Sequence, residues 1–276
     1  MLIQIIKSIL FGIVEGITEW LPVSSTGHLI LLNEFVKLDV SQEFYELFEV
    51  VIQLGAILAI GLVLFKRIWP WGFGKTKEDT KKTFKLWWLM FIGCIPAGVL
   101  GVLFDDFFEE KMHTPIIIAI ALIVYGMIFI LMEHCNFGKR TTKKIEDITV
   151  KQAGVVGLFQ VLSLIPGTSR SGSTIIGGLS SGFDRPTIAE FTFLLAIPVM
   201  AGASLIKFAM YIKDVGFHFT SDELMVLGVG CLVAFLVSMV VTNAFLKYIK
   251  KHDFKVFGYY RIILGLAVLA YFLFVK

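Results

Sequence analysis

The stretch "PGTSRSGST", residues 166–174, holds an arginine, five hydroxyl side chains, two glycines and a proline between apolar runs at 153–165 and 175–179. Proline and glycine interrupt regular helices, and serine and threonine often cap helix ends. The stretch therefore predicts a turn between two short helices, the second of which begins near Arg170.

Composition places that turn in a membrane. The chain of 276 residues is 57% hydrophobic and 17% charged, with a mean hydropathy of +0.82, and soluble domains are usually less apolar. A helix of about 20 residues crosses the hydrocarbon of a bilayer. We expect six membrane-spanning helices, at residues 47–65, 86–104, 115–132, 188–208, 224–246 and 257–275.

Two further apolar stretches, residues 1–36 and 150–182, are each interrupted in the middle by a proline and a cluster of hydroxyl and glycine residues. Neither half of either stretch is long enough to span a bilayer. Non-helical backbone at membrane depth is tolerated only where it is buried in protein or lines a wet cavity. The predicted fold class is therefore an all-α integral membrane protein with six transmembrane helices plus two re-entrant helical hairpins.

The charges of the loops predict the orientation in the membrane. Three loops carry seven, five and four lysines and arginines: 66–85, 133–151 and 247–255. The other three carry one, one and two: 37–47, 105–113 and 207–223. Basic loops face the cytoplasm. Six spans satisfy this rule when the first hairpin enters from outside, the second enters from inside, and both termini face outside.

Entry from opposite sides suggests an internal duplication, and an offset of 145 residues aligns the two hairpins. The offset pairs Gly12 with Gly157, Glu15 with Gln160, Thr18 with Ser163, Ser24 with Ser169, Thr26 with Ser171 and Gly27 with Gly172. The spans that follow begin with "FEVVIQLGAILA" (48–59) and "AEFTFLLAIPVM" (189–200). We expect a single membrane domain, 1–276, with inverted-repeat halves at 1–133 and 150–276 joined by a basic cytoplasmic loop at 134–149. Inverted repeats place their shared site near the bilayer midplane.

The hairpins carry four ionisable residues, Glu15, Glu19, His28 and Arg170. A charge at bilayer depth costs on the order of 3 kcal/mol, so these groups must be paired, hydrated or bound to a ligand. Arg170 lies between two serines at a helix start, where free backbone N–H groups favour an anion. A guanidinium fork together with hydroxyls and amides suits a phosphate.

Other polar residues have simpler interpretations. Small residues in membrane helices usually serve helix packing, and we interpret Gly12 and Gly157 in that way. Glu133, at the end of a span, is expected to be solvated. The stretch "GTSRSGST" has the spacing of a P-loop, but Ser173 stands in the place of the lysine and no strand precedes it. We therefore predict no nucleotide site and no nucleic-acid partner.

Two motifs carry a resemblance to a known family. "EGITEWLPVSSTGH" (15–28) and "PGTSRSGST" closely resemble the signature motifs of the bacterial undecaprenyl-diphosphate phosphatases of the BacA/UppP type, also called bacitracin-resistance proteins, and the similarity extends over nearly the whole chain. The resemblance implies hydrolysis of undecaprenyl diphosphate to undecaprenyl phosphate and inorganic phosphate, which recycles the lipid carrier of peptidoglycan synthesis. It also implies a divalent cation, Mg²⁺ or Ca²⁺, and a homodimer in the lipid bilayer of the bacterial plasma membrane.

Phosphate chemistry predicts roles for these residues. Cleavage of a diphosphate needs charge neutralisation on the non-bridging oxygens and a positioned nucleophile. The expected phosphate-binding residues are Ser24, Thr26, Ser169, Arg170, Ser171 and Thr174.

The candidate catalytic residues are Glu19, Ser25, His28 and Arg170. Glu15 and Glu19 could hold the cation through hard oxygen ligands, or one of them could act as a base. We favour Ser25 as nucleophile, paired with His28. Attack by His28 itself or by water remains an alternative. The site is predicted to open to the extracellular side, where the first hairpin is rooted.

A transporter or lipid flippase is the rival interpretation, because inverted repeats with re-entrant hairpins are transporter architecture. The same four ionisable groups could bind and carry a phosphorylated lipid without chemistry, and fold alone does not decide function. A purely structural scaffold would leave these charges unexplained.

Overall fold

The computed structural model describes residues 1–72, 74–112, 114–135 and 141–274. Six of its helices are long and apolar enough to cross a membrane: α3 (Gln42–Val63), α5 (Lys77–Met112), α6 (Pro115–His134), α9 (Arg185–Val215), α10 (Ser221–Tyr248) and α11 (Lys255–Phe274). The chain is therefore an all-helical, multi-pass membrane protein. Within the described ranges there is no β-strand, and β-pairing is limited to an isolated bridge between Thr142 and Phe183.

The six predicted spans are confirmed, with bounds that differ by several residues. Polar caps extend three of the helices: Ser41, Asp184 and Thr220 each accept a hydrogen bond from the backbone N–H three residues later, which satisfies a donor that a helix start leaves free. α5 bends at Phe104 and continues to Met112, so residues 105–112, which we expected in a loop, are helical. Position 275, the predicted end of the last span, lies outside the described residues, as does position 113.

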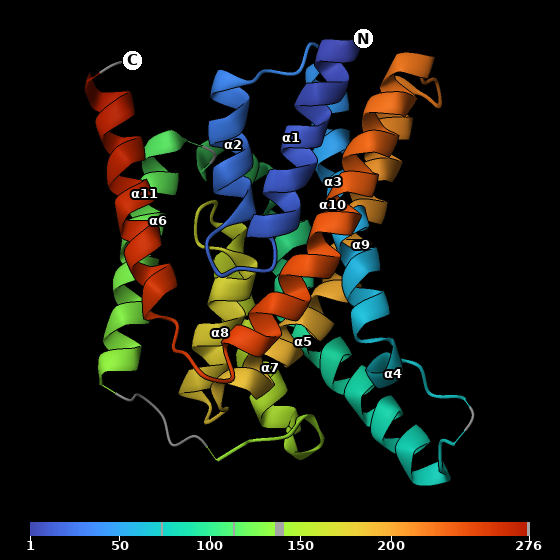
Figure 1. Ribbon diagram of the computed structural model, residues 1–276, viewed down its shortest axis with the longest axis vertical. Helices are drawn as coiled ribbons and strands as arrows, with labels where there is room; N and C mark the ends of the chain where they lie inside the picture. Colours follow the sequence, from blue (N-terminus) through green and yellow to red (C-terminus); the bar gives the residue numbers. More distant parts are fainter. Residues whose placement is uncertain (73, 113, 136–140, 275–276) are drawn as a thin grey trace.

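Shorter helices form two antiparallel pairs. α1 (Leu2–Thr18) runs from the end of the molecule that holds both termini to its middle, and α2 (Ser25–Phe35) returns to that end (Figure 1). α7 (Val150–Gln160) and α8 (Arg170–Ser180) do the same from the opposite end, with a short 3₁₀ helix (Val161–Leu164) after α7. The first turn, residues 19–24, and the second turn, residues 165–169, therefore both lie near the middle of the molecule.

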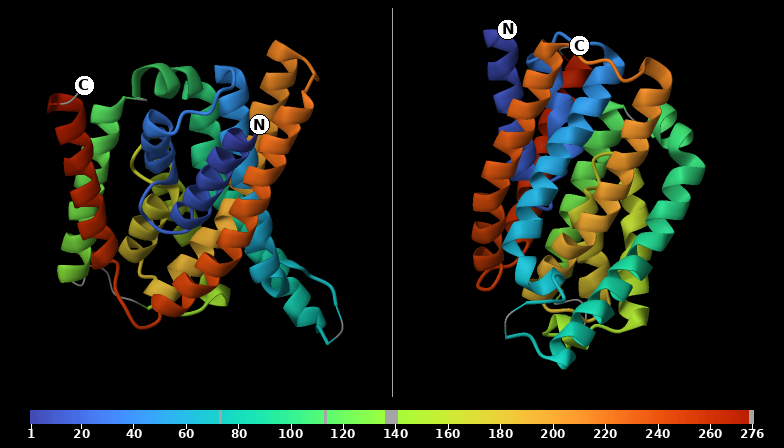
Figure 2. Two further views of the ribbon diagram at one scale, coloured as in Figure 1. Left: turned by 45° about the horizontal axis from the view of Figure 1, so that its top comes forward. Right: turned by 90° about the vertical axis from the view of Figure 1, so that its right-hand side faces the viewer.

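Glycines bring the shorter helices against the long ones. A Cβ added at Gly12 in α1 would lie 2.6 Å from the carbonyl oxygen of Gly230 in α10, and one at Gly157 in α7 would lie 2.6 Å from that of Gly93 in α5. Only glycine allows backbones to approach this closely. Gly12 and Gly157 are therefore confirmed as packing positions. α6 and α11 pack on each other as a separate pair at one side of the molecule (Figure 2).

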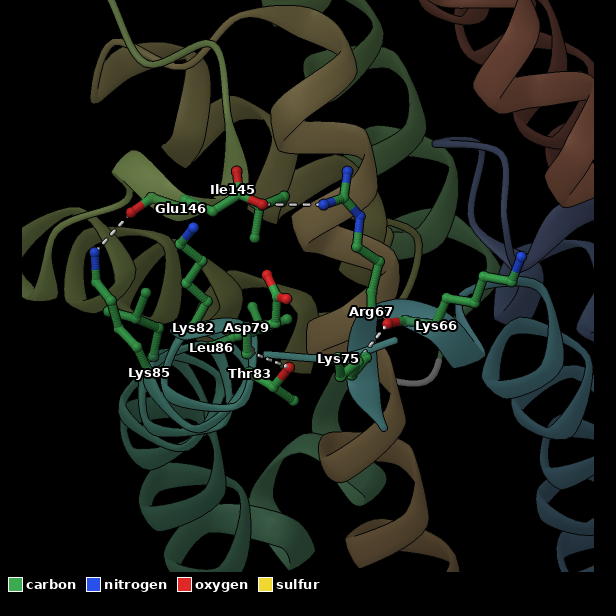
Figure 3. A pocket seen from close by; sticks show the side chains of 11 residues that line it. Lys66, Arg67, Lys75, Asp79, Lys82, Thr83, Lys85, Leu86, Ile145 and Glu146 are labelled. Carbon is green, nitrogen blue, oxygen red and sulfur yellow. Dashed lines mark hydrogen bonds and ion pairs between the residues drawn. The ribbon is translucent and has the colours of Figure 1, made fainter. Parts of the chain in front are cut away.

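The three basic loops lie at the end of the molecule opposite the termini (Figure 1). Figure 3 shows part of this end, where Arg67 of α4 (Phe65–Ile68) donates to the carboxylate of Glu146 at 3.0 Å and Lys85 donates to its carbonyl at 2.7 Å. Arg67 also pairs with Glu190 of α9 at 2.8 Å. These contacts join the loop before α7 to α4 and α5, and join α4 to α9. Residues 136–140 of that loop lie outside the described part of the chain.

Glu133 is buried, so the expectation that it is solvated was wrong. Its two carboxylate oxygens accept hydrogen bonds from Nε and Nη2 of Arg185 at 2.8 and 2.5 Å, and the backbone N–H of Phe254 donates to it at 3.3 Å. The partners lie 52 and 121 residues away in sequence. Sequence position near the end of a span does not reveal such partners.

The contact between α7 and α5 gives a first prediction. We expect Gly157→Ala to lower the free energy of unfolding by about 1–3 kcal/mol, because the added methyl group must displace one backbone from the other. Gly154→Ala on the same helix is the control, since the nearest atom to its Cβ lies 4.0 Å away and alanine favours helix. Thermal unfolding of both purified variants in detergent measures the difference. Equal destabilisation by the two variants would contradict the packing role.

Candidate functional site

The two turns meet around a cavity of about 250 Å³, which we call the central cavity. Its wall takes residues from both turns and the helix starts that follow them, and also from α3 and α9. Its polar lining residues are Glu19, Ser24, Ser25, Thr26, Gln53, Ser163, Ser169, Arg170 and Ser171. Seven of these were predicted as site residues, so the structure brings most of the predicted set together.

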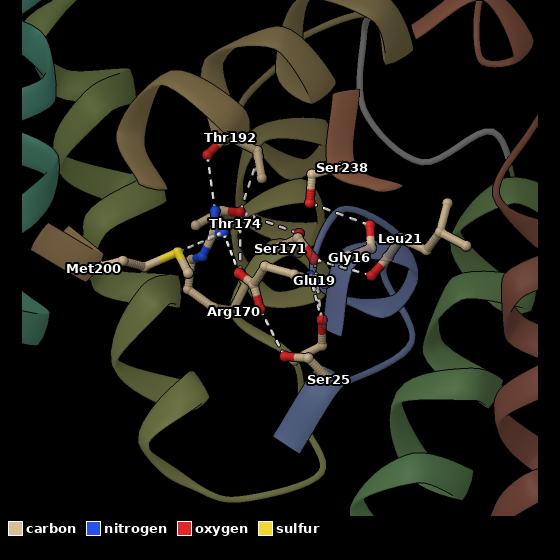
Figure 4. Close-up of polar contacts among 12 residues, drawn as sticks. Gly16, Glu19, Leu21, Ser25, Arg170, Ser171, Thr174, Thr192, Met200 and Ser238 are labelled. Atoms are coloured by element: carbon tan, nitrogen blue, oxygen red, sulfur yellow. Dashed lines mark hydrogen bonds and ion pairs between the residues drawn. The ribbon is translucent and has the colours of Figure 1, made fainter. Parts of the chain in front are cut away.

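An ion pair between the turns lies at the centre of this set. Arg170 Nη2 donates to Glu19 Oε1 at 2.6 Å, and Ser25 Oγ donates to Glu19 Oε2 at 2.6 Å (Figure 4). The exposed fractions of the two charged side chains are only 12% and 8%. Burial at this level makes each charge costly without the other, since one unpaired charge would have no compensation for its lost hydration.

α9 fixes the orientation of the Arg170 guanidinium. Nη1 donates to the carbonyl oxygen of Thr192 at 2.9 Å, and Nη2 also approaches the sulfur of Met200 at 3.3 Å. Nε is buried and has no hydrogen-bond partner among the described residues. The fork is thus held by three partners: Glu19, Thr192 and Met200.

Strained backbone begins both helices that leave the turns. Ser24 and Ser169 have φ values of 74° and 72°, and they are the only non-glycine residues with positive φ in the described ranges. Each is the N-cap of its helix and accepts a hydrogen bond from the N–H of a glycine three residues later. Such strain costs about 1–3 kcal/mol and occurs mainly at functional sites. Both N-caps line the central cavity, and helix N-termini bind anions.

Thr174 does not line the cavity. Its hydroxyl lies 2.9 Å from that of Thr192 and donates to the carbonyl of Arg170 at 3.1 Å. It is fully buried. Thr174 therefore supports the position of Arg170 from behind, and a direct phosphate contact stays a prediction.

His28 is directed away from Ser25. Its Nδ1 lies 2.6 Å from the carbonyl oxygen of Ser24 and its Nε2 lies 2.7 Å from the hydroxyl of Tyr260 in α11, whose ring stacks on it with centroids 5.7 Å apart. The predicted Ser25–His28 pair is not formed in this structure. The physical reason is that Tyr260, 232 residues away, takes one ring nitrogen of His28, while Glu19 takes the Ser25 hydroxyl.

Glu15 is fully buried beneath the ion pair, one helical turn from Glu19. Neither of its carboxylate oxygens has a hydrogen-bond partner among the described residues. The charged groups that act on it are Glu19, Glu49 and Arg170. A buried carboxylate without a donor is stable only when it is protonated or beside a cation.

Of the two predicted cation ligands, Glu19 lines the central cavity, whereas Glu15 is fully buried and is not among the lining residues. The oxygens of Glu19 accept hydrogen bonds from Arg170 and Ser25, whereas those of Glu15 have no hydrogen-bond partner in the part of the chain that the structure describes. No group of three or more His, Cys, Asp or Glu side chains suited to a metal occurs in the described part of the chain. A cation held here would take most of its ligands from phosphate and water, as Mg²⁺ commonly does.

Sequence reasoning missed several residues of the site. Gln53 lines the cavity from α3, Thr192 holds Arg170, and Glu49 accepts a hydrogen bond from Tyr45 at 2.9 Å one turn before Gln53. An ionisable residue inside an apolar span indicates a functional site, so Glu49 could have been predicted as a candidate from the sequence. A threonine that acts through its backbone carbonyl gives no such signal.

Comparison with known proteins shows one family. The profile of the family described as "Bacitracin resistance protein BacA" matches residues 8–267. The chain is 53% identical to an undecaprenyl-diphosphatase of Enterococcus faecalis, with 97% of this chain and 96% of the relative covered. It is 53% identical to undecaprenyl-diphosphatase 1 of Clostridioides difficile (98% and 97% covered) and 49% identical to an undecaprenyl-diphosphatase of Acetivibrio thermocellus (100% of each).

Proposed function

The chain belongs to the BacA family of bacitracin resistance proteins, and on that premise we propose that it hydrolyses undecaprenyl diphosphate to undecaprenyl phosphate and inorganic phosphate. This reaction returns the lipid carrier to cell-wall synthesis and confers resistance to bacitracin. The observation that carries the proposal is the contact of Ser25 and Arg170 with the same carboxylate, Glu19, in the central cavity. A hydroxyl beside a carboxylate and a guanidinium is the set that phosphoryl transfer needs.

In the proposed reaction Glu19 acts as the base. Its Oε2 takes the proton of Ser25 Oγ, which attacks the terminal phosphorus while the bond from that phosphorus to the bridging oxygen breaks. Undecaprenyl phosphate leaves with the electron pair of that bond. Glu19 gives this proton to the departing undecaprenyl phosphate and is a carboxylate again. Water then attacks the phosphoserine and gives a proton to Glu19, which passes it to Ser25 Oγ as the bond from that oxygen to phosphorus breaks and inorganic phosphate leaves. The hydrogen bond from Ser25 to Glu19 supports this assignment over one to His28.

Arg170 and the helix starts neutralise the phosphate. The substrate oxygens would compete with Glu19 for the guanidinium, and the N–H groups at the start of α8 would add further partners. A transporter would need the positive charge of Arg170 to bind the phosphate. It would not need a nucleophilic hydroxyl that donates to a base, as Ser25 donates to Glu19. That contact therefore favours hydrolysis over transport.

A divalent cation belongs to the proposal. Glu15 would hold it, and the cation would supply charge neutralisation at the non-bridging oxygens. Glu19, already bonded twice, is better suited to the role of base. We also propose a homodimer, which the mass of the detergent-solubilised protein tests against the 30.9 kDa of one chain.

We propose that the two helix pairs are re-entrant hairpins of an inverted repeat. The contacts repeat in exchanged form: α1 packs on α10 as α7 packs on α5, and α3 packs on α10 as α9 packs on α5. The strained N-caps Ser24 and Ser169 are also 145 residues apart. In the spans that follow, Glu49 of α3 interacts electrostatically with Lys207 of α9. In the other half, Glu190 of α9 forms an ion pair with Arg67 of α4. These equivalences support two halves of 1–133 and 150–276.

The proposed orientation follows from the same arrangement. All three basic loops lie at one end of the molecule, which would face the cytoplasm. Both termini and the root of the first helix pair would then face outside. The diphosphate would enter from the extracellular side while its isoprenoid chain stays in lipid.

The activity itself is tested with Arg170→Lys. Purified protein should release inorganic phosphate from a C55 or C15 diphosphate, and the variant should lose at least about 2 kcal/mol of transition-state stabilisation, or roughly thirtyfold in rate, because an ammonium does not reproduce the fork. Arg67→Lys at the basic end is the matched control and should keep its rate. Near-normal turnover of Arg170→Lys would refute the phosphate contact, and binding of the diphosphate without turnover by the unmodified protein would favour transport.

The two carboxylates should behave differently in a metal titration. Glu15→Gln should raise the Mg²⁺ or Ca²⁺ concentration needed for half-maximal rate by about tenfold or more, because a ligand oxygen loses its charge. Glu19→Gln should lower the rate at saturating cation, since it removes the base. An unchanged titration curve for Glu15→Gln would exclude it as a cation ligand.

Thiol labelling tests the orientation. With Cys94, Cys135 and Cys231 replaced, Thr26→Cys on the cavity wall should react with an impermeant thiol reagent added outside intact cells, and a diphosphate analogue should protect it. Ser173→Cys, fully buried and away from the cavity wall, is the control and should not react. Labelling only in inverted vesicles would reverse the orientation, and comparable labelling from both sides would favour alternating access.

A further inference from the structure

Arg261 in α11 is a second buried arginine close to the site. Its exposed fraction is 0%. Nη1 donates to the carbonyl oxygen of Pro22 at 3.1 Å, and Nη2 donates to those of Gly167 and Thr168 at 2.7 and 3.0 Å. One guanidinium therefore bonds the first turn and the second turn at once.

The acceptors occupy equivalent places in the two turns. Pro22 and Gly167 are 145 residues apart, the offset that aligns the helix pairs. Pro22 lies three residues after Glu19 and three before Ser25, and Gly167 lies three residues before Arg170. Arg261 thus bonds each turn at a point three residues away from a residue of the proposed reaction.

The buried guanidinium of Arg261 has no carboxylate partner in the described part of the chain, so charge pairing does not explain its burial. Among the described residues, no carboxylate accepts a hydrogen bond from Arg261. The face of the Tyr125 ring, 5.6 Å from the guanidinium carbon, is its other polar contact, and Nε reaches only a long contact of 3.5 Å to the carbonyl of Leu122. A buried cation without a carboxylate partner keeps much of the cost of its lost hydration.

α6 and α11 supply a rigid support for this contact. A Cβ added at Gly167 would lie 2.6 Å from the carbonyl oxygen of Ile118 in α6, and Gly126 of α6 and Gly258 of α11 approach each other equally closely, at 2.7 Å by the same measure. The second turn is therefore pressed against the helix pair from which Arg261 projects. Both turns therefore contact the same helix pair, α6 and α11: the second turn by packing, and both turns through Arg261.

We propose that Arg261 is a positioning residue for the proposed phosphatase reaction: by bonding the carbonyls of both turns it sets the spacing that brings Glu19 and Ser25 to Arg170. Arg261 does not line the central cavity, so it acts through the turns and not on the substrate. A shift of about 1 Å between reacting groups can cost a hundredfold in rate. This inference rests on the proposed activity, but the spacing itself can be measured without it.

The first experiment measures spacing without activity. In a background that lacks the native cysteines, Leu21→Cys and Ser171→Cys place thiols in the first turn and at the start of α8, which meet where Ser171 Oγ donates to the carbonyl of Leu21 at 3.3 Å. A short bifunctional thiol reagent should cross-link this pair, and adding Arg261→Met should lower the yield at least about threefold. Arg185→Met, which removes a partly buried arginine from its ion pair with Glu133, is the matched control and should leave the yield unchanged.

The second experiment is a double-mutant cycle on the rate of phosphate release. Arg261→Met should lower kcat by about tenfold or more, and the extra loss from Arg170→Lys should fall from roughly thirtyfold to below about fivefold in that background, because the guanidinium is already misplaced. If Arg261→Met only made a fraction of the protein inactive, the rates with and without Arg170→Lys would fall by the same factor. Their ratio would then stay at roughly thirtyfold. In the Arg185→Met background the ratio should stay near thirtyfold.

Arg261→Lys separates geometry from charge. It keeps the positive charge but does not bond both turns with a planar fork, so it should behave like Arg261→Met in both experiments. Arg261→Gln replaces Arg261→Met if the latter does not give folded protein. Unchanged cross-linking, a ratio that stays at thirtyfold, or recovery by Arg261→Lys to within about twofold of the unmodified rate would each overturn the inference. Absence of phosphate release from the unmodified protein would instead refute the proposed function, and the cross-linking result would still decide the role of Arg261.

Discussion

The ion pair between Glu19 and Arg170 sets the requirements that the rest of the structure meets. Two charges that are nearly buried in an apolar protein must be in contact, because neither can be left alone without a large cost. They come from chain segments 151 residues apart, and their atoms are 2.6 Å apart. Contact is possible only if two helices stop at the same depth and the turns after them meet. The breaks at the two turns and the glycine contacts of α1 and α7 provide that geometry.

The same pair connects architecture with chemistry. Glu19 has one oxygen for Arg170 and one for Ser25, so the interaction that holds the turns together also orients the proposed nucleophile. The strained N-caps begin two helices at the cavity, where their free N–H groups favour an anion. Glu15 has no hydrogen-bond donor in the described part of the chain, so burial favours its protonated form or a cation beside it.

Local physical rules explain why much of the fold was predictable. Membrane spans depend on the length and polarity of a continuous segment, and turns depend on proline, glycine and hydroxyl residues within a few positions. The start of α8 at Arg170 and the packing of Gly12 and Gly157 follow from such rules and are confirmed. The same rules were wrong for Glu133, whose partner Arg185 lies 52 residues later and reaches it only in the folded chain. They were also wrong for residues 105–112, where α5 continues past its bend.

The sequence alone determined that the chain lies in a membrane, where it crosses or breaks, and which ionisable and hydroxyl residues belong to the breaks. These are properties of composition and of neighbours along the chain. Tertiary structure decided which of those residues touch. Ser25 bonds Glu19 while His28, three residues later, turns to Tyr260 of α11. Arg261 joins Pro22 to Gly167 across distances of 239 and 94 residues. Such choices depend on the angles and depths at which helices pack, and those arise only when all the apolar faces and buried charges are satisfied together.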